Sequence, residues 1–247
     1  MSHGIYSATS GAVAQQRALD VTANNVANAN TVGYRADRVA FDEALATAGA
    51  RTAQPPSLRY SVAERVVMES SSGALQNTGN PYDLAIGGEG YFVLGTPQGE
   101  RYTRTGSFVM SADGVLRTPD GNDLLGDGRP DPRVRIPPNA RDVTIGSDGT
   151  VRADGEDIAR IRVVNFADPA TLGTEGESRF FAAAPPVAAP ATTTVVQGAL
   201  ETSNVNAVAG LNEVISISRL FESLERVIQT FSQIDSRTAR DLGSRSG

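Results

Sequence analysis

Apolar residues at the start of the chain recur at the spacing of packed helices. Ile5, Ala12, Leu19 and Val26 follow one another every seven residues. This heptad repeat is typical of helices that wind around other helices. It predicts a helix from Ser2 to about Asn30. Because alanine supplies much of the apolar face, such a helix would be only marginally stable on its own.

A second heptad pattern predicts a long helix over about residues 205–242. At a rise of 1.5 Å per residue this helix would be roughly 50 Å long, far beyond the average helix of a globular protein. Its stripe is widened by Leu220, Val227 and Ile234, which favours burial among several helices. A helix packed only on its own domain is the alternative, although the length argues against it. The two heptad tracks are Val214, Phe221, Ile228 and Leu242, and Ile217, Leu224 and Phe231.

Asparagines crowd the predicted end of the first helix. Asn24, Asn25, Asn28 and Asn30 are followed by Gly33. Asparagine and glycine both suit the left-handed residue that closes a helix. At this stage capping and a specific packing role are equally good explanations.

The middle of the chain has the pattern of a β domain. We expect a short helix at Arg38–Ala48 and a strand at Val62–Met68, followed by short apolar runs separated by turn residues from about Gly73 to Phe181. Asp-Gly pairs are frequent between these runs, and type I′ hairpin turns favour this dipeptide. The pattern predicts an antiparallel sandwich or small barrel. The Asp-Gly pairs interpreted as hairpin turns begin at Asp113, Asp120, Asp148 and Asp154, and the strand candidates are 84–86, 91–94, 102–105, 108–110, 115–116, 134–136, 143–145, 150–152 and 158–166.

A short repeat brackets the β region. Gly-Ala-Leu-Gln-Asn at residues 73–77 resembles Gly-Ala-Leu-Glu-Thr at residues 198–202. The simplest interpretation is an α+β fold, in which long N- and C-terminal helices pair as a discontinuous, coiled-coil-like module and a mainly antiparallel β-domain is inserted between them. The expected parts are an N-terminal helix (1–33), a connecting segment of mixed structure (34–75), the β-domain (76–184), an extended connector (185–204) and a C-terminal helix (205–247).

Composition excludes several classes of function. The chain of 247 residues has a net charge of −6 and no cysteine. The negative charge argues against nonspecific nucleic-acid binding, and the absence of cysteine excludes disulfides, thiolate zinc sites and cysteine nucleophiles. We expect no cleavable signal peptide and no direct membrane insertion, because a basic start before an apolar core and a run of about 20 apolar residues are both missing.

The search for chemistry in the sequence finds no catalytic, cofactor or metal site. His3 is the single histidine, which cannot build a usual zinc site. The acidic stretch Asp120–Asp131 has Leu124 and Leu125 where a calcium loop needs a ligand and a glycine. Gly87–Gly90 lies between two strand candidates and therefore fails the nucleotide-binding patterns. We predict a protein that is not an enzyme and needs no cofactor.

Four long segments of the chain form specific motifs. At the N-terminus the segment is Ala-Asn-Asn-Val-Ala-Asn-Ala-Asn-Thr-Val-Gly-Tyr at 23–34, and at the C-terminus it is Gly-Ala-Leu-Glu-Thr-Ser-Asn-Val-Asn at 198–206. The middle agrees through Thr-Gly-Asn-Pro-Tyr-Asp-Leu-Ala-Ile-Gly-Gly-Glu-Gly-Tyr-Phe at 78–92 and Arg-Tyr-Thr-Arg-Thr-Gly-Ser-Phe at 101–108. Together these segments resemble the bacterial flagellar rod and hook proteins, and the resemblance covers nearly the whole chain. Within the family, His-Gly-Ile-Tyr at 3–6 favours the proximal-rod type over the distal-rod type.

The resemblance implies a structural subunit of the flagellar basal body that serves motility. Members of the family are exported by the flagellar type III apparatus without a cleaved signal and assemble into a hollow helical rod that crosses the periplasm. The implied partners are neighbouring proximal- and distal-rod proteins, other copies of this chain and the export apparatus. Terminal helices form the inner layer of the rod. The expected assembly interface comprises Ile5, Ala12, Leu19, Asn24, Asn25, Val26, Asn28, Val214, Ile217, Phe221, Leu224, Ile228 and Phe231.

From a different class, the rival interpretation is a secreted β-domain protein that binds a ligand. That function would require a cleft with convergent polar groups in the β region, and it would not need the two ends of the chain.

Overall fold

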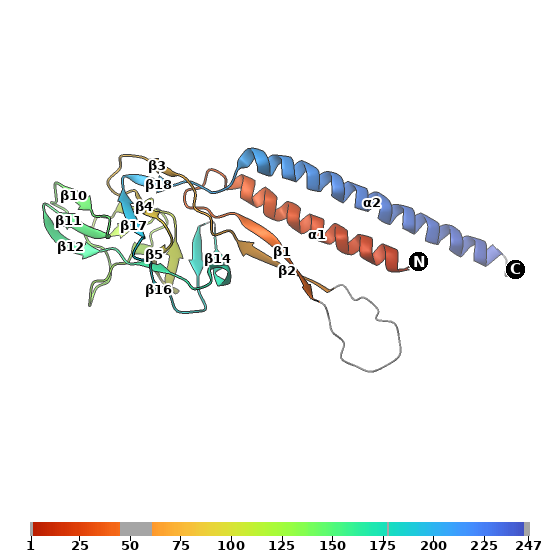
Figure 1. Cartoon of the computed structure of the whole chain (residues 1–247), viewed down its shortest axis with the longest axis horizontal. Helices are drawn as coiled ribbons and strands as arrows, with labels where there is room; N and C mark the ends of the chain where they lie inside the picture. Colours follow the sequence, from red (N-terminus) through yellow and green to blue (C-terminus); the bar gives the residue numbers. More distant parts are fainter. Residues whose placement is uncertain (1, 45–60, 177, 245–247) are drawn as a thin grey trace, which may run out of the picture. The chain divides into compact units, whose positions relative to one another are not determined.

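The computed structural model describes residues 2–44, 61–176 and 178–244. In sequence the β region lies between two long helices, and its described strands pair in antiparallel fashion, as the α+β prediction expected (Figure 1). Contacts divide the chain into two units. The helical unit comprises Met1–Val26, Asp37–Val67 and Asn206–Gly247, and the β unit comprises Ala27–Ala36 and Met68–Val205.

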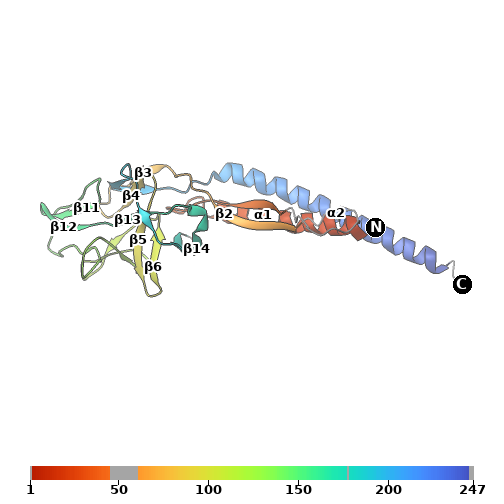
Figure 2. The same cartoon turned by 60° about the horizontal axis from the view of Figure 1, so that its bottom comes forward.

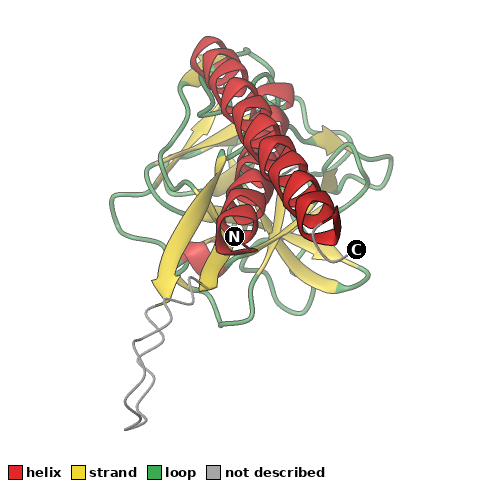
Figure 3. Ribbon diagram, turned by 90° about the vertical axis from the view of Figure 1, so that its right-hand side faces the viewer, coloured by secondary structure: helices red, strands yellow, loops and turns green. Residues whose placement is uncertain are grey.

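The helical unit is built on α1 (Ser2–Ala27) and α2 (Ala207–Ser244). The two helices run side by side in opposite directions (Figures 1 and 2), and they cross when viewed along their length (Figure 3). Asn206 caps α2, because its side-chain Oδ1 accepts a hydrogen bond of 3.0 Å from the backbone N–H of Ala209. With 38 residues, α2 is about 57 Å long.

A β-hairpin completes the helical unit. Its strands are β1 (Asp37–Ala44) and β2 (Ser61–Met68), which pair with each other. The strand expected at Val62–Met68 is confirmed. The short helix expected at Arg38–Ala48 is wrong over residues 38–44, and its remaining positions lie outside the described residues. Local helical spacing is a weak signal over so few residues, and pairing with β2 overrides it.

The β unit contains the remaining strands and one short helix. Its largest sheet has the order β14-β15-β6-β5-β9-β8-β7, and β13 joins it by pairing with β5 and β16. A separate sheet has the order β10-β11-β12, and β4 pairs with β17. The elements are β3 (Leu75–Asn77), β4 (Leu84–Gly87), β5 (Tyr91–Thr96), β6 (Gly99–Thr103), β7 (Val109–Met110), β8 (Leu116–Arg117), β9 (Asp123–Leu124), β10 (Val143–Ile145), β11 (Thr150–Ala153), β12 (Glu156–Arg160), β13 (Val163–Asn165), η1 (Pro169–Thr171), β14 (Gly173–Glu175), β15 (Arg179–Phe181), β16 (Val187–Ala188), β17 (Thr194–Gln197) and β18 (Ala199–Glu201).

The two copies of the bracketing repeat pair with each other. β3 and β18 are antiparallel, with Leu75 opposite Glu201 and Leu200 opposite Gln76. The repeated sequence is therefore two facing strands that close the β unit at its beginning and its end. Gly73 is required here, because a Cβ atom at this position would lie 1.8 Å from the backbone oxygen of Thr202.

Most predicted strands are confirmed, and the differences have local causes. Residues 134–136 form no strand, although Arg135 makes an isolated bridge to Val115. The expected connector 185–204 contains β16, β17 and β18, so much of its extended chain is paired. Only Asp154-Gly155 has the two positive φ values of a type I′ turn, 51° and 89°. At the other three predicted hairpin turns the glycine alone has a positive φ.

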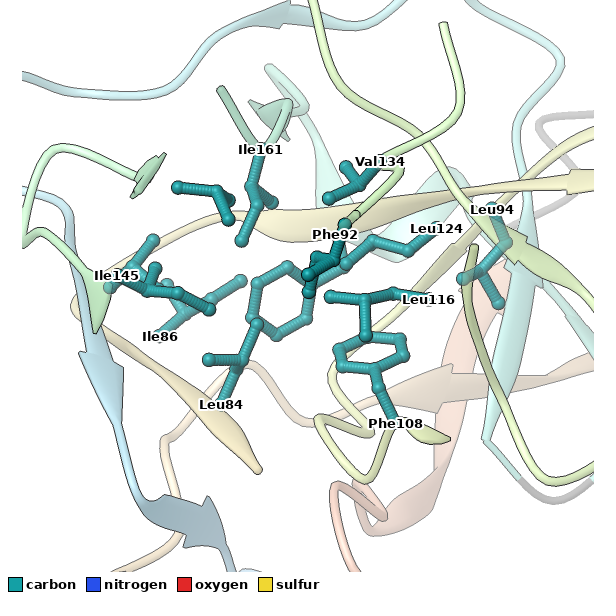
Figure 4. Packing of buried hydrophobic residues seen from close by; sticks show 13 residues of the cluster. Leu84, Ile86, Phe92, Leu94, Phe108, Leu116, Leu124, Val134, Ile145 and Ile161 are labelled. Atoms are coloured by element: carbon teal, nitrogen blue, oxygen red, sulfur yellow. The ribbon is translucent and has the colours of Figure 1, made fainter. Parts of the chain in front are cut away.

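Two apolar clusters form the core of the β unit. Figure 4 shows the first, in which Phe92 and Phe108 lie among aliphatic side chains and meet edge to face with ring centroids 5.5 Å apart. In the second, Tyr91 makes edge contacts with Phe166 and Phe180. Both clusters lie within the β unit, so its core needs no residue of the helical unit.

Phe92→Ala should destabilise the β unit strongly. The side chain is fully buried, and truncating a buried phenylalanine costs about 3–5 kcal/mol. Chemical denaturation of the purified chain measures this loss. Val109→Ala is the control, because Val109 is 49% exposed and its truncation should cost less than about 0.5 kcal/mol. Equal effects of the two changes would contradict the observed core.

Candidate assembly surface

One face of α2 is used inside the chain. A methyl group placed on Gly11 of α1 would lie 3.7 Å from Leu224 Cδ1, and one placed on Gly210 would lie 2.6 Å from Val26 Cγ2. Ala8, Ala12 and Thr22 of α1 are buried, at heptad-related positions. The small residues of α1 therefore allow α2 to approach closely.

A second set of apolar side chains on α2 is exposed. Leu220, Val227 and Ile234 recur every seven residues, and each is at least 42% exposed. Leu220 and Val227 each precede a residue of the Phe221–Ile228 heptad track by one position, and Ile234 precedes the next position of that track. The three side chains therefore lie about 100° around the helix from this track. We call these three residues the exposed stripe. Val208, Leu211 and Ile215 form a second exposed group at the start of the helix.

The asparagines at the end of α1 have specific partners. Asn25 Nδ2 donates to the backbone oxygen of Asp37 at 2.6 Å, and Asn25 Oδ1 accepts from the Asp37 N–H at 2.9 Å. Asn28 is buried, and its Oδ1 accepts a hydrogen bond from Thr31 Oγ1. The packing explanation therefore holds for Asn25, which fixes the beginning of β1. The sequence offered only the clustering of asparagines as a signal.

The expected interface residues fall into three groups. Ala12 and Asn28 are buried and Asn24 is exposed. The others are half-buried: Ile5, Leu19, Asn25, Val26, Val214, Ile217, Phe221, Leu224, Ile228 and Phe231. Leu224 and Val26 contact the partner helix, so part of the expected interface stabilises the subunit itself. In the sequence the exposed stripe widens the apolar face of the helix, but its residues lie outside the expected interface.

A cleft in the β unit is the place to look for ligand chemistry. It has a volume of about 780 Å³ and is lined by residues of β12, β13, β16 and β17. Its two arginines are bound within the chain. Arg160 Nε donates to the backbone oxygen of Asp148 at 3.1 Å, and Arg162 forms an ion pair with Glu100. Both arginines of the cleft therefore have a partner within the β unit, while Arg162 Nε is buried with no hydrogen-bond partner among the described residues.

The acidic loop binds arginines. Asp123 accepts a 2.5 Å hydrogen bond from Arg117 Nε, and Asp131 pairs with Arg133. The hydrogen bond from Arg133 lowers the pKa of Asp131 to about 2. Among the described residues no three metal-ligating side chains gather at one place. Within the described residues, neither α1 nor α2 is long and apolar enough to cross a membrane.

An inserted β unit and a pair of terminal helices with an exposed apolar stripe are features of a structural subunit. Comparison with known proteins agrees. Residues 5–35 match the family model described as flagella basal body rod protein. Residues 85–153 match the flagellar hook protein FlgE/F/G D1 domain, and residues 196–241 match the flagellar basal body rod FlgEFG protein C-terminal model.

Full-length relatives bear the same names. The chain is 32% identical to the flagellar basal-body rod protein FlgF of Mesorhizobium japonicum, with 100% of both chains covered. It is 30% identical to FlgF of Caulobacter vibrioides (98% and 99% covered), and 34% identical to the rod protein FlgG of Bacillus subtilis (95% and 97% covered). The chain belongs to the flagellar basal-body rod protein family. Within it the chain is most like FlgF, as the sequence predicted.

Gly11→Ala should stabilise the helical unit by up to about 1 kcal/mol, because alanine favours a helix interior and its methyl group would make ordinary contact with Leu224. Thermal unfolding followed by the helical circular dichroism signal measures the change. Gly210→Ala is the matched control, since its methyl group would crowd Val26 and offset the gain. Equal stabilisation by both changes would show that the helices are not packed at Gly210.

Chelation should leave the melting temperature unchanged. Replacing Asp120, Asp123 and Asp127 with asparagine should cost at most about 1 kcal/mol, because the one ion pair it removes, Asp123 with Arg117, is partly exposed. Calorimetry with and without a chelator checks this. A calcium-dependent rise of several degrees that these replacements abolish would reveal a metal site.

Proposed function

We propose that this rod subunit assembles through α1 and α2, with the exposed stripe as its main contact to the helices of neighbouring subunits. The single observation that supports this is the exposure of Leu220, Val227 and Ile234 at heptad spacing on a helix of 38 residues. Exposed apolar side chains in such a row are costly unless a partner covers them. The seven-residue period matches a helical partner.

The exposed stripe also indicates which proteins lie next to this subunit. We infer that α2 contacts the terminal helices of adjacent rod proteins, and that other copies of this chain are among them. Heterologous contacts that do not close into a ring give a helical filament when they repeat, and a hollow rod is the assembly that we propose. The likeness to FlgF supports a proximal position in the rod. The half-buried residues of the expected interface, such as Phe221 and Ile228, would border the contact.

We also propose how the protein is exported and where it is located. The chain would be exported by the flagellar type III apparatus without a cleaved signal peptide, and it would cross the periplasm as part of the rod without inserting into a membrane. It would carry out no reaction and need no cofactor. Family membership supports these statements, since the matched relatives are basal-body rod proteins.

Val227→Asp should prevent rod assembly while the purified subunit stays folded. The side chain is 42% exposed in the subunit, so a charge there is solvated until a partner covers it. Burying an unpaired carboxylate in a helix contact costs several kcal/mol. Motility, the yield of basal bodies and the melting curve of the variant check this result. Phe221→Asp and Ile228→Asp should also block assembly, but they should lower subunit stability as well.

The control for Val227→Asp is Glu222→Ala on the charged side of α2. Among the described residues Glu222 pairs with Arg226, at 3.6 Å, and both side chains are well exposed. Its removal should leave motility normal, because such a pair contributes a few tenths of a kcal/mol. Normal rods in the Val227→Asp strain would refute the exposed stripe as an assembly contact.

A further inference from the structure

Three charged side chains are buried together inside the β unit. Glu201 Oε1 lies 2.8 Å from Arg35 Nη2, and Glu201 Oε2 lies 3.1 Å from Arg104 Nη1. The side chains of Arg35 and Glu201 are 2% exposed and that of Arg104 is 4% exposed. We call these three residues the Glu201 cluster. It contains two positive charges and one negative charge, so Glu201 neutralises only one of the two arginines.

Arg104 also contacts backbone groups and an aromatic ring, while its Nε is buried with no hydrogen-bond partner among the described residues. Arg104 donates to the backbone oxygens of Ile86 at 3.2 Å and Gly88 at 2.7 Å, and its guanidinium lies 5.5 Å from the centre of the Tyr91 ring. Burial lowers the pKa of Arg104 from its usual value, while the charge of Glu201 acts in the opposite direction. Removing Glu201 would therefore leave two buried arginines without an anion.

Glu201 also binds the backbone of two distant segments. Its carboxylate accepts a 2.9 Å hydrogen bond from the N–H of Gly73, which is 128 residues away in the sequence. Its backbone oxygen accepts a 2.8 Å hydrogen bond from the N–H of Gly33. Asn204 extends the same contacts, because Oδ1 accepts from the Ala36 N–H at 2.7 Å and Nδ2 donates to the Ser71 backbone oxygen at 3.0 Å.

These bonds join the segments next to the places where the chain passes between the two units. The chain crosses from one unit to the other after Val26, Ala36, Val67 and Val205. The segment 27–36 lies between the first two, the segment 69–73 follows the third, and the segment 201–204 precedes the fourth. All bonds named here lie within the β unit. The cluster therefore gathers the connections to α1, to the hairpin and to α2 on one part of the β unit.

Stability alone does not account for a cluster of this kind. Burying charges is expensive, and apolar residues of similar size often stabilise a protein as well or better. Directional bonds to one carboxylate do specify a single arrangement of the segments that they join. The facing strand makes the contrast plain, because Gln76 occupies the position of the repeat that corresponds to Glu201 and is exposed.

We propose that Glu201 is the positioning residue that holds the chain connections of the helical unit together on the β unit, so that α1, the hairpin and α2 start from one rigid body. Its importance for the rod rests on the proposed assembly through the helices. Its local effect can be measured in the free subunit, which separates failure of this proposal from failure of the assembly proposal.

Glu201→Gln in the full chain tests the proposal. Amide hydrogen exchange at Gly73 and Gly33 should accelerate about tenfold or more, because the segments are released locally. The N–H of Leu125, which bonds the Val93 oxygen at 2.9 Å in the core, should keep its protection. Strains with this variant should form few rods. Asp123→Asn is the matched control, since it removes the carboxylate of a partly exposed ion pair in the same unit and should change neither exchange rate nor motility.

Arg104→Met provides a second variant in case Glu201→Gln does not fold. It leaves the pair of Arg35 and Glu201 neutral, so exchange at Gly73 should accelerate less than in Glu201→Gln. Three results would overturn the proposal: unchanged exchange at Gly73, equal acceleration at Leu125, or normal rods despite released segments. A larger effect of Arg104→Met than of Glu201→Gln would also overturn it.

Discussion

The pairing of β3 with β18 is the constraint on which the architecture depends. These strands lie at the two ends of the inserted β unit, and their hydrogen bonds bring residues 75–77 beside residues 199–201. The chain consequently enters and leaves the β unit at neighbouring places. Only then can a helix from each end of the sequence belong to the same helical unit. The Glu201 cluster adds side-chain bonds at this closure, from Glu201 on β18 to Arg35 and Arg104.

The two units meet different physical demands. The β unit contains both apolar clusters and needs no partner to bury them. The helical unit depends on the contact of a small-residue face on α1 with a larger face on α2, and it leaves the exposed stripe to solvent. Fully burying a Leu, Val or Ile side chain contributes about 1.5–3 kcal/mol. Because the stripe residues are between 42% and 48% exposed, a partner that covered them would add roughly half of this amount for each.

Sequence patterns predicted the helices well because their periodicity is long and continuous. They failed at Arg38–Ala44, where an apolar spacing compatible with a helix forms β1, because pairing with β2 is not visible in local sequence. The repeat at 73–77 and 198–202 indicated an insertion, but it did not reveal that the copies face each other. Val26 and Leu224 were expected at the interface, although the sequence could not show that each has a contact on the partner helix within the subunit. The Glu201 cluster was missed altogether, since its members are far apart in the chain and belong to no local motif.

Photo-crosslinking in assembled basal bodies tests the central claim most directly. A photoreactive amino acid placed at Val227 should form covalent products with another rod subunit. The same group at Arg226, on the charged side of α2, should leave the subunit uncrosslinked. Efficient products from position 226 and none from position 227 would contradict the account, because the exposed stripe would then face away from the neighbouring subunits.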